Sequence, residues 1–316
     1  MTIHFKAIIF LSFSFSSIAL HGIAQKDGQI ISETKVIHLP YDSVKGLSDY
    51  YDRATYDKVI KSNMKLSRIV YYSDGLKVIA YLAEPKLIQS KKYPVVIFNR
   101  GSYLRNDIAE VHAPLFDKLT QNSFIVIAPA LRESEGGEGK DELGGKDLDD
   151  IWNVLPILYS KSYVDTSNLF MFGESRGGIM TLELLKNNFP VKAAATIGAI
   201  TDFWAYKDEM KGIETFSRKI WPDYDQNKDS IYFKRSALKW ADRINTPLLL
   251  MQGTADWSVN PHHSIDLAEK MNALKKDFQF LLWNGGNHIL SGKWTDKRDQ
   301  EIMDWFTHHM VNNKTN

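Results

Sequence analysis

One serine of this sequence stands in a setting that could make it a nucleophile. Ser175 lies in the segment GESRGG, between Gly173 and Gly177, with the apolar run NLFMF before it and the helical pattern IMTLELLKNN after it. A strand, a sharp turn and a helix form the context in which a nucleophilic serine is exposed above a sheet. Glycines suit this turn because side chains at 173 and 177 would collide with neighbouring backbone. The pattern alone also fits a serine in a glycine-rich turn, so Ser175 needs a base to activate it.

An acid and a histidine follow in the order that such a nucleophile requires. Asp256 lies in the loop after the apolar run PLLLMQG, and His288 lies in a glycine-containing loop after DFQFLLW. Alone, Asp256 could close a turn or cap a helix, and His288 could be a surface histidine. Both follow strands, however, and the carboxyl ends of strands are where open α/β sheets assemble their sites. The sequence therefore predicts Ser175 as nucleophile, His288 as base and Asp256 as the acid that orients it.

An oxyanion hole should complete this site. One donor is expected to be the backbone N–H of Arg176, and the second should come from the loop after the strand PVVIFN. That loop reads Arg100-Gly101-Ser102-Tyr103, in which small residues allow a backbone amide to face the substrate. We assign the second donor to the backbone of Ser102, with the hydroxyl of Tyr103 as a rival. The sequence does not decide between them.

The other histidines do not form a metal-binding pattern. His262 and His263 precede a helix, His308 and His309 lie on the terminal one, and adjacent helical histidines are not expected to face one metal. There is no H-E-x-x-H motif, and the acidic run 133–150 has no partner histidines. The sequence contains no cysteine, which excludes disulfides, thiolate metal sites and a cysteine nucleophile. No metal and no cofactor are predicted.

Charged residues on the loops near the predicted site have two interpretations. Arg100, Arg132, Glu133 and Glu135 could bind a charged end of a substrate, but solvated loop charge is the commoner explanation. No substrate-binding residue is assigned from the sequence.

The elements that must position these residues follow an alternating pattern. Apolar runs that are continuous rather than alternating predict strands covered on both faces, and helical patterns separate them. These runs are residues 94–99, 123–130, 168–173, 191–198, 247–253 and 277–283. Before them, Asp74-Gly75 favours a tight hairpin. The fold class is α/β, with a mostly parallel sheet and helices on both faces.

The chain divides into three parts. Residues 1–24 resemble a cleaved secretory signal, because a basic start is followed by an apolar run too short to be a good membrane anchor. Residues 25–63 form a partly helical arm, and residues 64–316 form one catalytic domain. Within that domain residues 199–246 predict a helical insertion that can act as a lid. The mature protein is then expected to be exported, to a bacterial periplasm or outside the cell, without a membrane span.

The overall charge of the chain is close to neutral. The chain has 316 residues, 44% of them hydrophobic and 24% charged, and its formal net charge is +1. A balance this close to neutral gives no indication of nucleic acid or an anionic membrane as a partner. The oligomeric state is not indicated.

Several segments together resemble a known family. GKDLDDIWNVL, YVDTSNLFMFGESRGG, KRSALKWADRINTPLLLMQGTADWSVNP and NGGNH, in this order and spacing, are similar to the catalytic domain of the prolyl oligopeptidase family. The resemblance runs from about residue 65 to 310 and implies an α/β hydrolase fold with Ser175, Asp256 and His288 as the catalytic residues. Peptidases of this family usually carry a β-propeller, which the residues before the hairpin cannot form. The usual His-Gly-Gly of the oxyanion loop is replaced by Arg100-Gly101-Ser102.

Three functions are compatible with these residues. The leading hypothesis is an exported serine hydrolase of the prolyl oligopeptidase type that cleaves short peptides. A carboxylesterase acting on small or carbohydrate-linked acyl esters would use the same triad. A binding protein that has lost catalysis is disfavoured because the three residues are intact.

Overall fold

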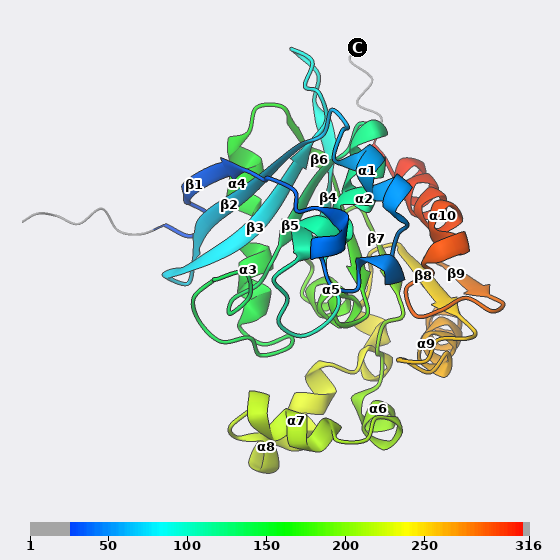
Figure 1. The fold of residues 1–316 in the computed structure, drawn as a ribbon. Helices are drawn as coiled ribbons and strands as arrows, with labels where there is room; N and C mark the ends of the chain where they lie inside the picture. Colours follow the sequence, from blue (N-terminus) through cyan, green and yellow to red (C-terminus); the bar gives the residue numbers. More distant parts are fainter. Residues whose placement is uncertain (1–25, 312–316) are drawn as a thin grey trace, which may run out of the picture.

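A single mixed sheet organises the part of the chain that the structure describes. The computed structural model describes residues 26–311, so the predicted signal segment lies outside the described residues. Within them nine strands form one sheet in the order β1-β2-β3-β5-β4-β6-β7-β8-β9 (Figure 1). The pairs from β5 to β9 along this order are parallel, and β1, β2, β3 and β5 pair antiparallel. The predicted mostly parallel α/β hydrolase sheet is confirmed.

The strands follow the predicted apolar runs closely. They are β1 (Ile30–Lys35), β2 (Lys65–Ser73), β3 (Leu76–Glu84), β4 (Tyr93–Asn99), β5 (Ile125–Pro129), β6 (Val164–Glu174), β7 (Ala193–Ile197), β8 (Leu248–Gly253) and β9 (Phe278–Trp283). Continuous apolarity has the expected cause. In β4, Val95 and Ile97 enter the core on one face, while Val96 and Phe98 enter the core on the other. The hairpin between β2 and β3 turns at Asp74 and Gly75, both with positive φ.

Helices cover both faces of the sheet. They are α1 (Arg53–Val59), α2 (Ile108–Gln121), α3 (Asp147–Trp152), α4 (Leu155–Ser160), α5 (Arg176–Lys186), α6 (Phe203–Glu209), α7 (Ile213–Ile220), α8 (Tyr224–Lys234), α9 (His262–Ala273) and α10 (Thr295–His308). Residues of α2 and α10 share one core with the sheet, and residues of α3, α4, α5 and α9 share the other. None of the described helices is long and apolar enough to cross a membrane.

The segment between β5 and β6 contains two short helices, α3 and α4, rather than one continuous helix. The chain leaves α3 after Trp152 and begins α4 at Leu155. Pro156 explains the break, because its ring excludes the carbonyl of residue 152 and it has no N–H to donate. Pro156 is tolerated in the first turn of α4, where that N–H would have no partner.

The arm before β2 contains a strand that the sequence did not predict. β1 pairs antiparallel with β2 at the edge of the sheet, and all but its first residue are exposed. An edge strand with little burial has no apolar pattern, which is why the sequence analysis missed it. Farther along the arm, Tyr56 of α1 is buried against Val111 of α2.

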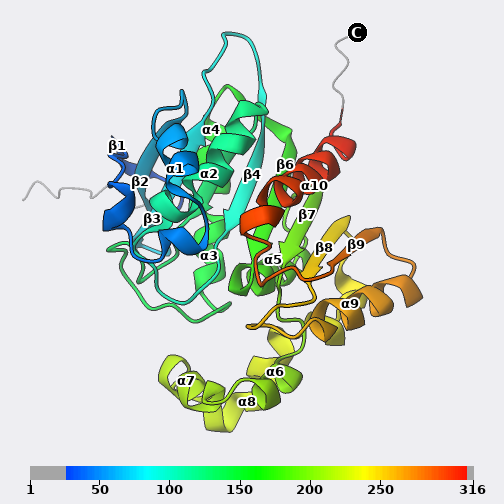
Figure 2. The same cartoon turned by 45° about the vertical axis from the view of Figure 1, so that its right-hand side comes forward.

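Residues 199–246 form a helical module between β7 and β8. It contains α6, α7, α8 and the short 3-10 helices η3 (Ala237–Lys239) and η4 (Ala241–Arg243). Figures 1 and 2 both show α6, α7 and α8 gathered apart from the sheet, below it in these views. Its apolar cluster includes Phe203, Trp221 and Tyr232, and it reaches the main body at Leu143 and Ile179.

Candidate active site

Ser175 occupies a strained turn between β6 and α5. Its backbone has φ 52° and ψ −118°, outside the regions that L residues favour. Strain of this kind is kept where the surrounding structure fixes the backbone. Here the Ser175 N–H donates to the Ile197 carbonyl of β7 at 2.8 Å, and the Gly178 N–H donates to the Ser175 carbonyl at 2.8 Å. The predicted strand, sharp turn and helix are therefore present.

The glycines of the turn are needed for the predicted steric reason. A Cβ at Gly173 would lie 2.3 Å from the Gly177 carbonyl oxygen, and a Cβ at Gly177 would lie 1.9 Å from the Asn99 carbonyl oxygen. A Cβ at Gly178 would lie 2.5 Å from the Cβ of Ala199, so this glycine lets α5 approach the chain that follows β7.

Asp256 and His288 are joined by a hydrogen bond. His288 Nδ1 and Asp256 Oδ2 are 2.8 Å apart, and the Asp256 side chain is fully buried. The other carboxylate oxygen accepts from the backbone N–H groups of Ser258 and Val259 at 2.8 and 2.9 Å. Burial raises the pKa of Asp256, but His288 and these two N–H groups lower it more, so the pKa lies below its ordinary value. An ionised Asp256 holds the proton of His288 on Nδ1 and leaves Nε2 able to accept one.

One segment of chain brings this pair next to Ser175. Ile197 accepts the hydrogen bond of the Ser175 N–H, and the next residue, Gly198, lies against the His288 ring. A Cβ at Gly198 would be 2.9 Å from both Nδ1 and Cε1 of that ring. Within the described residues the His288 side chain hydrogen-bonds to Asp256 and not to Ser175. Catalytic hydrogen bonds are often long before substrate binds and shorten in the substrate complex.

The loop after β4 approaches Ser175 with two N–H groups directed outward. A Cβ at Gly101 would lie 3.3 Å from Ser175 Cβ. Arg100 Nη1 donates to the carbonyls of Gly101 and Ser102, and in a planar trans peptide the N–H points opposite the C=O. The N–H groups of Ser102 and Tyr103 therefore point away from Arg100. Within residues 26–311 neither of them, nor the N–H of Arg176, donates a hydrogen bond.

The Tyr103 hydroxyl, the alternative oxyanion donor, points toward another acceptor. The Tyr103 hydroxyl donates to the backbone carbonyl of Asp141 at 3.5 Å, and the ring packs edge-on against Phe216 of α7 with 5.1 Å between centroids. The geometry favours the backbone amides over this hydroxyl as oxyanion donors.

The side chain of Arg176 has a role that the sequence analysis missed. Its guanidinium contacts both carboxylate oxygens of Asp141 at 2.6 Å and one of Asp147 at 2.7 Å, and all three side chains are buried. It also donates to the Ser102 carbonyl at 3.2 Å. Burial lowers the pKa of Arg176, but the two carboxylates outweigh this and raise it. Arg176 therefore connects the loop after β4 to the acidic run 133–150.

Neither interpretation of Arg100 and Arg132 from the sequence is correct. Both are buried, at 1% and 3% exposure, so they are neither solvated nor open to a substrate. Arg100 also donates to the Ala130 carbonyl, and Arg132 pairs with Asp150 and Asp74.

The described residues contain one group of side chains of metal-ligand type. Contrary to the expectation for adjacent histidines, the rings of His262 and His263 stack at 4.5 Å, and Nε2 of each faces Glu209. His263 Nδ1 accepts from the N–H groups of Thr201 and Asp202, however, so its proton must lie on Nε2. A metal-ligating histidine has the opposite arrangement, with its second nitrogen donating. The group therefore fits a hydrogen-bonded latch between α6 and α9 better than a metal site.

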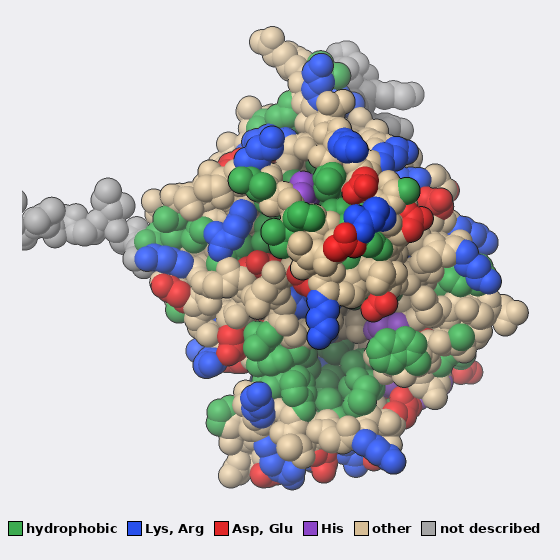
Figure 3. All heavy atoms as spheres, viewed as in Figure 1, with side chains coloured by type: hydrophobic (Ala, Val, Ile, Leu, Met, Phe, Trp, Pro, Cys, Tyr) green, Lys and Arg blue, Asp and Glu red, His purple; other side chains and the backbone are tan. Residues whose placement is uncertain are grey.

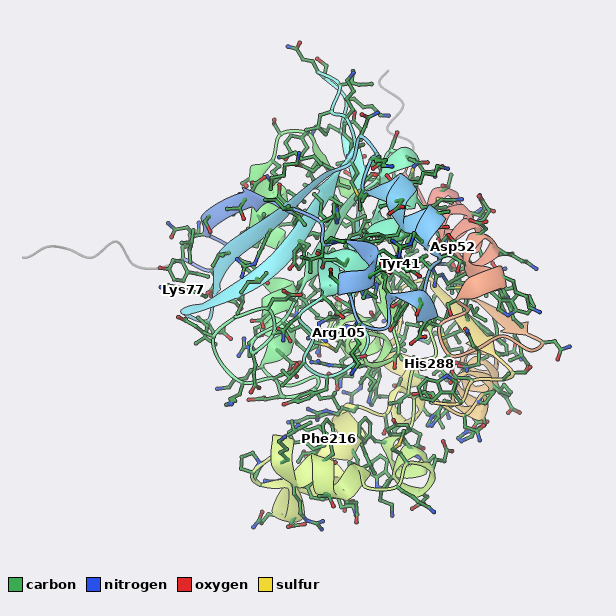
Figure 4. All side chains as sticks on the ribbon, in the orientation of Figure 1. Tyr41, Asp52, Lys77, Arg105, Phe216 and His288 are labelled. Carbon is green, nitrogen blue, oxygen red and sulfur yellow. The ribbon has the colours of Figure 1, made fainter. Side chains whose placement is uncertain are left out.

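The helical module overhangs this edge of the sheet. Figure 3 shows a hollow with hydrophobic side chains on its walls between the main body and α6, α7 and α8. In Figure 4, Phe216 lies on the module, and Arg105 and His288 lie on the main body above it. A substrate in this hollow would have aromatic surface on the side of the module.

Comparisons with known proteins point to one family. The family model of the prolyl oligopeptidase family matches residues 107–313. A Bacillus subtilis (strain 168) protein described as uncharacterized peptidase YtmA is 25% identical over 244 residues, which are 77% of this chain and 93% of that protein. Uncharacterized peptidase YuxL of the same organism is 24% identical over 251 residues, which are 75% of this chain and 38% of that protein.

A solved structure shares the fold. The Pyrococcus horikoshii acylaminoacyl peptidase superposes with a TM-score of 0.67 at 18% identity, over 84% of this chain and 45% of that one. The chain thus spans nearly all of YtmA but less than half of YuxL and of the acylaminoacyl peptidase. Because the family model covers more than half of its residues, the chain belongs to the prolyl oligopeptidase family and is a serine hydrolase of the peptidase class.

Proposed function

We propose that this chain is an exported serine peptidase that cleaves short peptides through Ser175, His288 and Asp256. The observation that carries the proposal is the hydrogen bond between His288 and the buried Asp256. The His288 ring also packs against Gly198, and the preceding residue, Ile197, accepts the hydrogen bond from the strained Ser175. Order in the sequence and position at one edge of the sheet support the same assignment.

The reaction uses both ring nitrogens of His288, with Nδ1 bonded to Asp256 and Nε2 free to exchange a proton. His288 Nε2 takes the proton of the Ser175 hydroxyl as Oγ attacks the acyl carbonyl carbon, and Asp256 stabilises the imidazolium that forms. His288 then gives the proton to the leaving amine as the carbon–nitrogen bond breaks. Water repeats the cycle on the acyl-enzyme, releasing the acid and restoring Ser175.

The developing oxyanion needs donors that are already in place. The N–H of Arg176 and the N–H of Ser102 have no acceptor among the described residues, and both belong to segments beside Ser175. Donors fixed before the reaction stabilise the transition state without reorganisation, and one such donor is worth about 10²–10³ in kcat. This supports the two amides as the oxyanion hole.

Labelling tests the nucleophile directly. A fluorophosphonate probe is expected to modify Ser175, and Ser175→Ala should abolish both labelling and turnover. Ser230→Ala, which removes an exposed serine on α8, is the matched control and should behave as wild type. Turnover that persists in pure Ser175→Ala protein would disprove the assignment.

A substrate panel separates peptidase from esterase. Aminoacyl anilides and short peptides should be cleaved, with loss of cleavage in Ser175→Ala. Hydrolysis of short acyl esters without any amide cleavage would overturn the peptidase proposal in favour of a carboxylesterase, which the same three residues would also support.

Export is a separate part of the proposal and has its own test. The apolar segment within residues 1–24 supports it. When the full chain is expressed in a bacterium, the mature protein should begin at Gln25 and should leave the cytoplasm. A cytoplasmic protein that retains residues 1–24 would contradict this.

A further inference from the structure

Trp257 is exposed at the position next to the proposed catalytic acid. Its exposed fraction is 82%, whereas Trp240 and Trp305 are buried in the cores. The Trp257 ring lies beside His288, with 6.1 Å between the ring centroids. A large apolar ring left in water beside a reacting histidine is available to contact a substrate.

An open cavity of about 410 Å³ adjoins this ring, between α6 and the loop after β8. Tyr206, Met210, Trp257 and Pro261 supply its apolar wall. The remaining lining residues are Glu209, Asp256, Ser258 and Asn260. Its size suits one amino-acid side chain rather than a long peptide.

The charge of the cavity is already offset. Glu209 is the carboxylate that is exposed to it, and this carboxylate is paired with His262 and faces His263. Burial lowers the pKa of His262, but Glu209 and Asp266 raise it more, which favours the charged imidazolium opposite Glu209. A cationic side chain would have to compete with this pair, whereas an aromatic or large apolar one would not.

The chemistry decides which part of the substrate lies here. His288 delivers its proton to the leaving amine, so the leaving group must lie on the His288 side of the scissile bond. The proposed oxyanion loop, which follows β4, approaches Ser175 through Gly101 instead. Trp257 and its cavity are on the His288 side.

We propose that Trp257 and the cavity beside it form the subsite for the first residue of the leaving group, with preference for an aromatic or large apolar side chain. This inference rests on the proposed function, because it requires an acyl-enzyme at Ser175. By microscopic reversibility an amine that attacks the acyl-enzyme enters through the same subsite. Its nitrogen bonds to the acyl carbon, the ester bond to Ser175 Oγ breaks, and His288 carries the proton from nitrogen to Oγ.

The experiment uses this reverse entry. The protein is acetylated with p-nitrophenyl acetate, and phenylalaninamide or glycinamide then competes with water for the acetyl-enzyme. Wild type should form N-acetylphenylalaninamide in preference to N-acetylglycinamide by about tenfold or more, the discrimination that one apolar pocket provides. Trp257→Ala should reduce that preference to less than about twofold, and Trp257→Phe should keep most of it. Tyr159→Ala, which removes an exposed ring on α4, is the control and should leave the preference unchanged.

The outcomes separate the two proposals. If p-nitrophenyl acetate turnover is the same in wild type and Ser175→Ala, the proposed function fails and no acyl-enzyme exists to test. If turnover depends on Ser175 but wild type shows no preference between the two amines, or if Trp257→Ala keeps the preference, the leaving-group subsite is wrong while the proposed function stands.

Discussion

On one side of Ser175 the proposed oxyanion loop is held by buried charges, whereas on the other side His288 lies beside an exposed tryptophan that lines an open cavity. On the first side, the buried side chains of Arg100 and Arg176 both donate hydrogen bonds to the Ser102 carbonyl of the loop. The second side leaves Trp257 in water, and Glu209, the exposed carboxylate in the cavity lining, pairs with His262.

The difference follows from what each side must do. An oxyanion donor must be in place before charge develops, and buried ion pairs fix a loop because breaking them leaves unpaired charges in a low dielectric. A subsite for variable side chains needs exposed apolar surface instead. In the proposed mechanism, rigidity and specificity are therefore assigned to different sides of Ser175.

Asp256→Asn should have the largest effect of the changes that distinguish these sides. An asparagine cannot hold the proton on His288 Nδ1, so kcat is expected to fall by about 10³–10⁴-fold with little change in fold. Because the pKa of Asp256 lies below its ordinary value, the loss should persist across neutral pH. Steady-state kinetics measures it. Asp266→Asn, which contacts His262 rather than His288, is the control, and an equal loss in that variant would remove the special role of Asp256.

Arg176→Gln should come next and should affect the rigid side. It leaves the buried Asp147 without its arginine partner and leaves Asp141 with only the longer contact to Arg100, at 4.0 Å, which is expected to cost about 3–5 kcal/mol of stability. It should also lower kcat per active site by about 10–10²-fold, because the oxyanion loop loses one of its anchors. Urea unfolding and kinetics normalised to fluorophosphonate-titrated sites measure the two effects.

A matched variant separates positioning from folding. Arg132→Gln removes another buried arginine that pairs with an aspartate of the same region, Asp150, but it does not contact the oxyanion loop. It should lose stability to a similar extent while kcat per active site stays within about threefold of wild type. If both variants lose kcat equally, Arg176 acts only through the fold.

His262→Gln should have a smaller effect, on the wall of the open side. The pKa of His262 is raised by Glu209 and Asp266 against the effect of burial, so the protonated ring stabilises the fold below the unfolded pKa of about 6.5. This contribution is lost as pH rises through the higher pKa of the folded protein. The variant should be less stable than wild type by about 0.5–1 kcal/mol at pH 5.5, with the difference shrinking at pH 9.

The measurement for this latch is urea unfolding at the two pH values. His308→Gln, which removes an exposed histidine of α10, is the matched control for a histidine substitution. A His262→Gln difference that grows with rising pH would reverse the sign and exclude the proposed pairing.

Tyr103→Phe should have the smallest effect. Its hydroxyl faces the Asp141 carbonyl, so its removal should change kcat by less than about threefold if backbone amides are the donors. Loss of about 10²-fold or more with unchanged KM would instead make this hydroxyl an oxyanion donor. Separate measurement of kcat and KM shows whether this hydroxyl or the backbone amides are the donors.

Much of the sheet and the order of the site residues could be predicted from local patterns. The runs that became β4 to β8 are largely buried on both faces, and continuous apolarity records this in the sequence. The strand β1 could not be predicted in the same way, because five of its six residues are exposed and leave no pattern. Pro156 could have indicated the break between α3 and α4, since its effect is local.

The sequence by itself determined the basis of the proposed chemistry, which is the set of glycines around Ser175 and the order of Ser175, Asp256 and His288. Their signals are local, since a sharp turn excludes side chains and a site at strand ends places its residues in the following loops. The tertiary structure alone decided which charges are buried: Arg176 meets Asp141, 35 residues earlier, and Arg100 turns inward. It also decided that Trp257 stays in water beside a cavity whose other wall is α6. These contacts and exposures depend on how segments far apart in the chain pack together, and local sequence patterns contain no information on that packing.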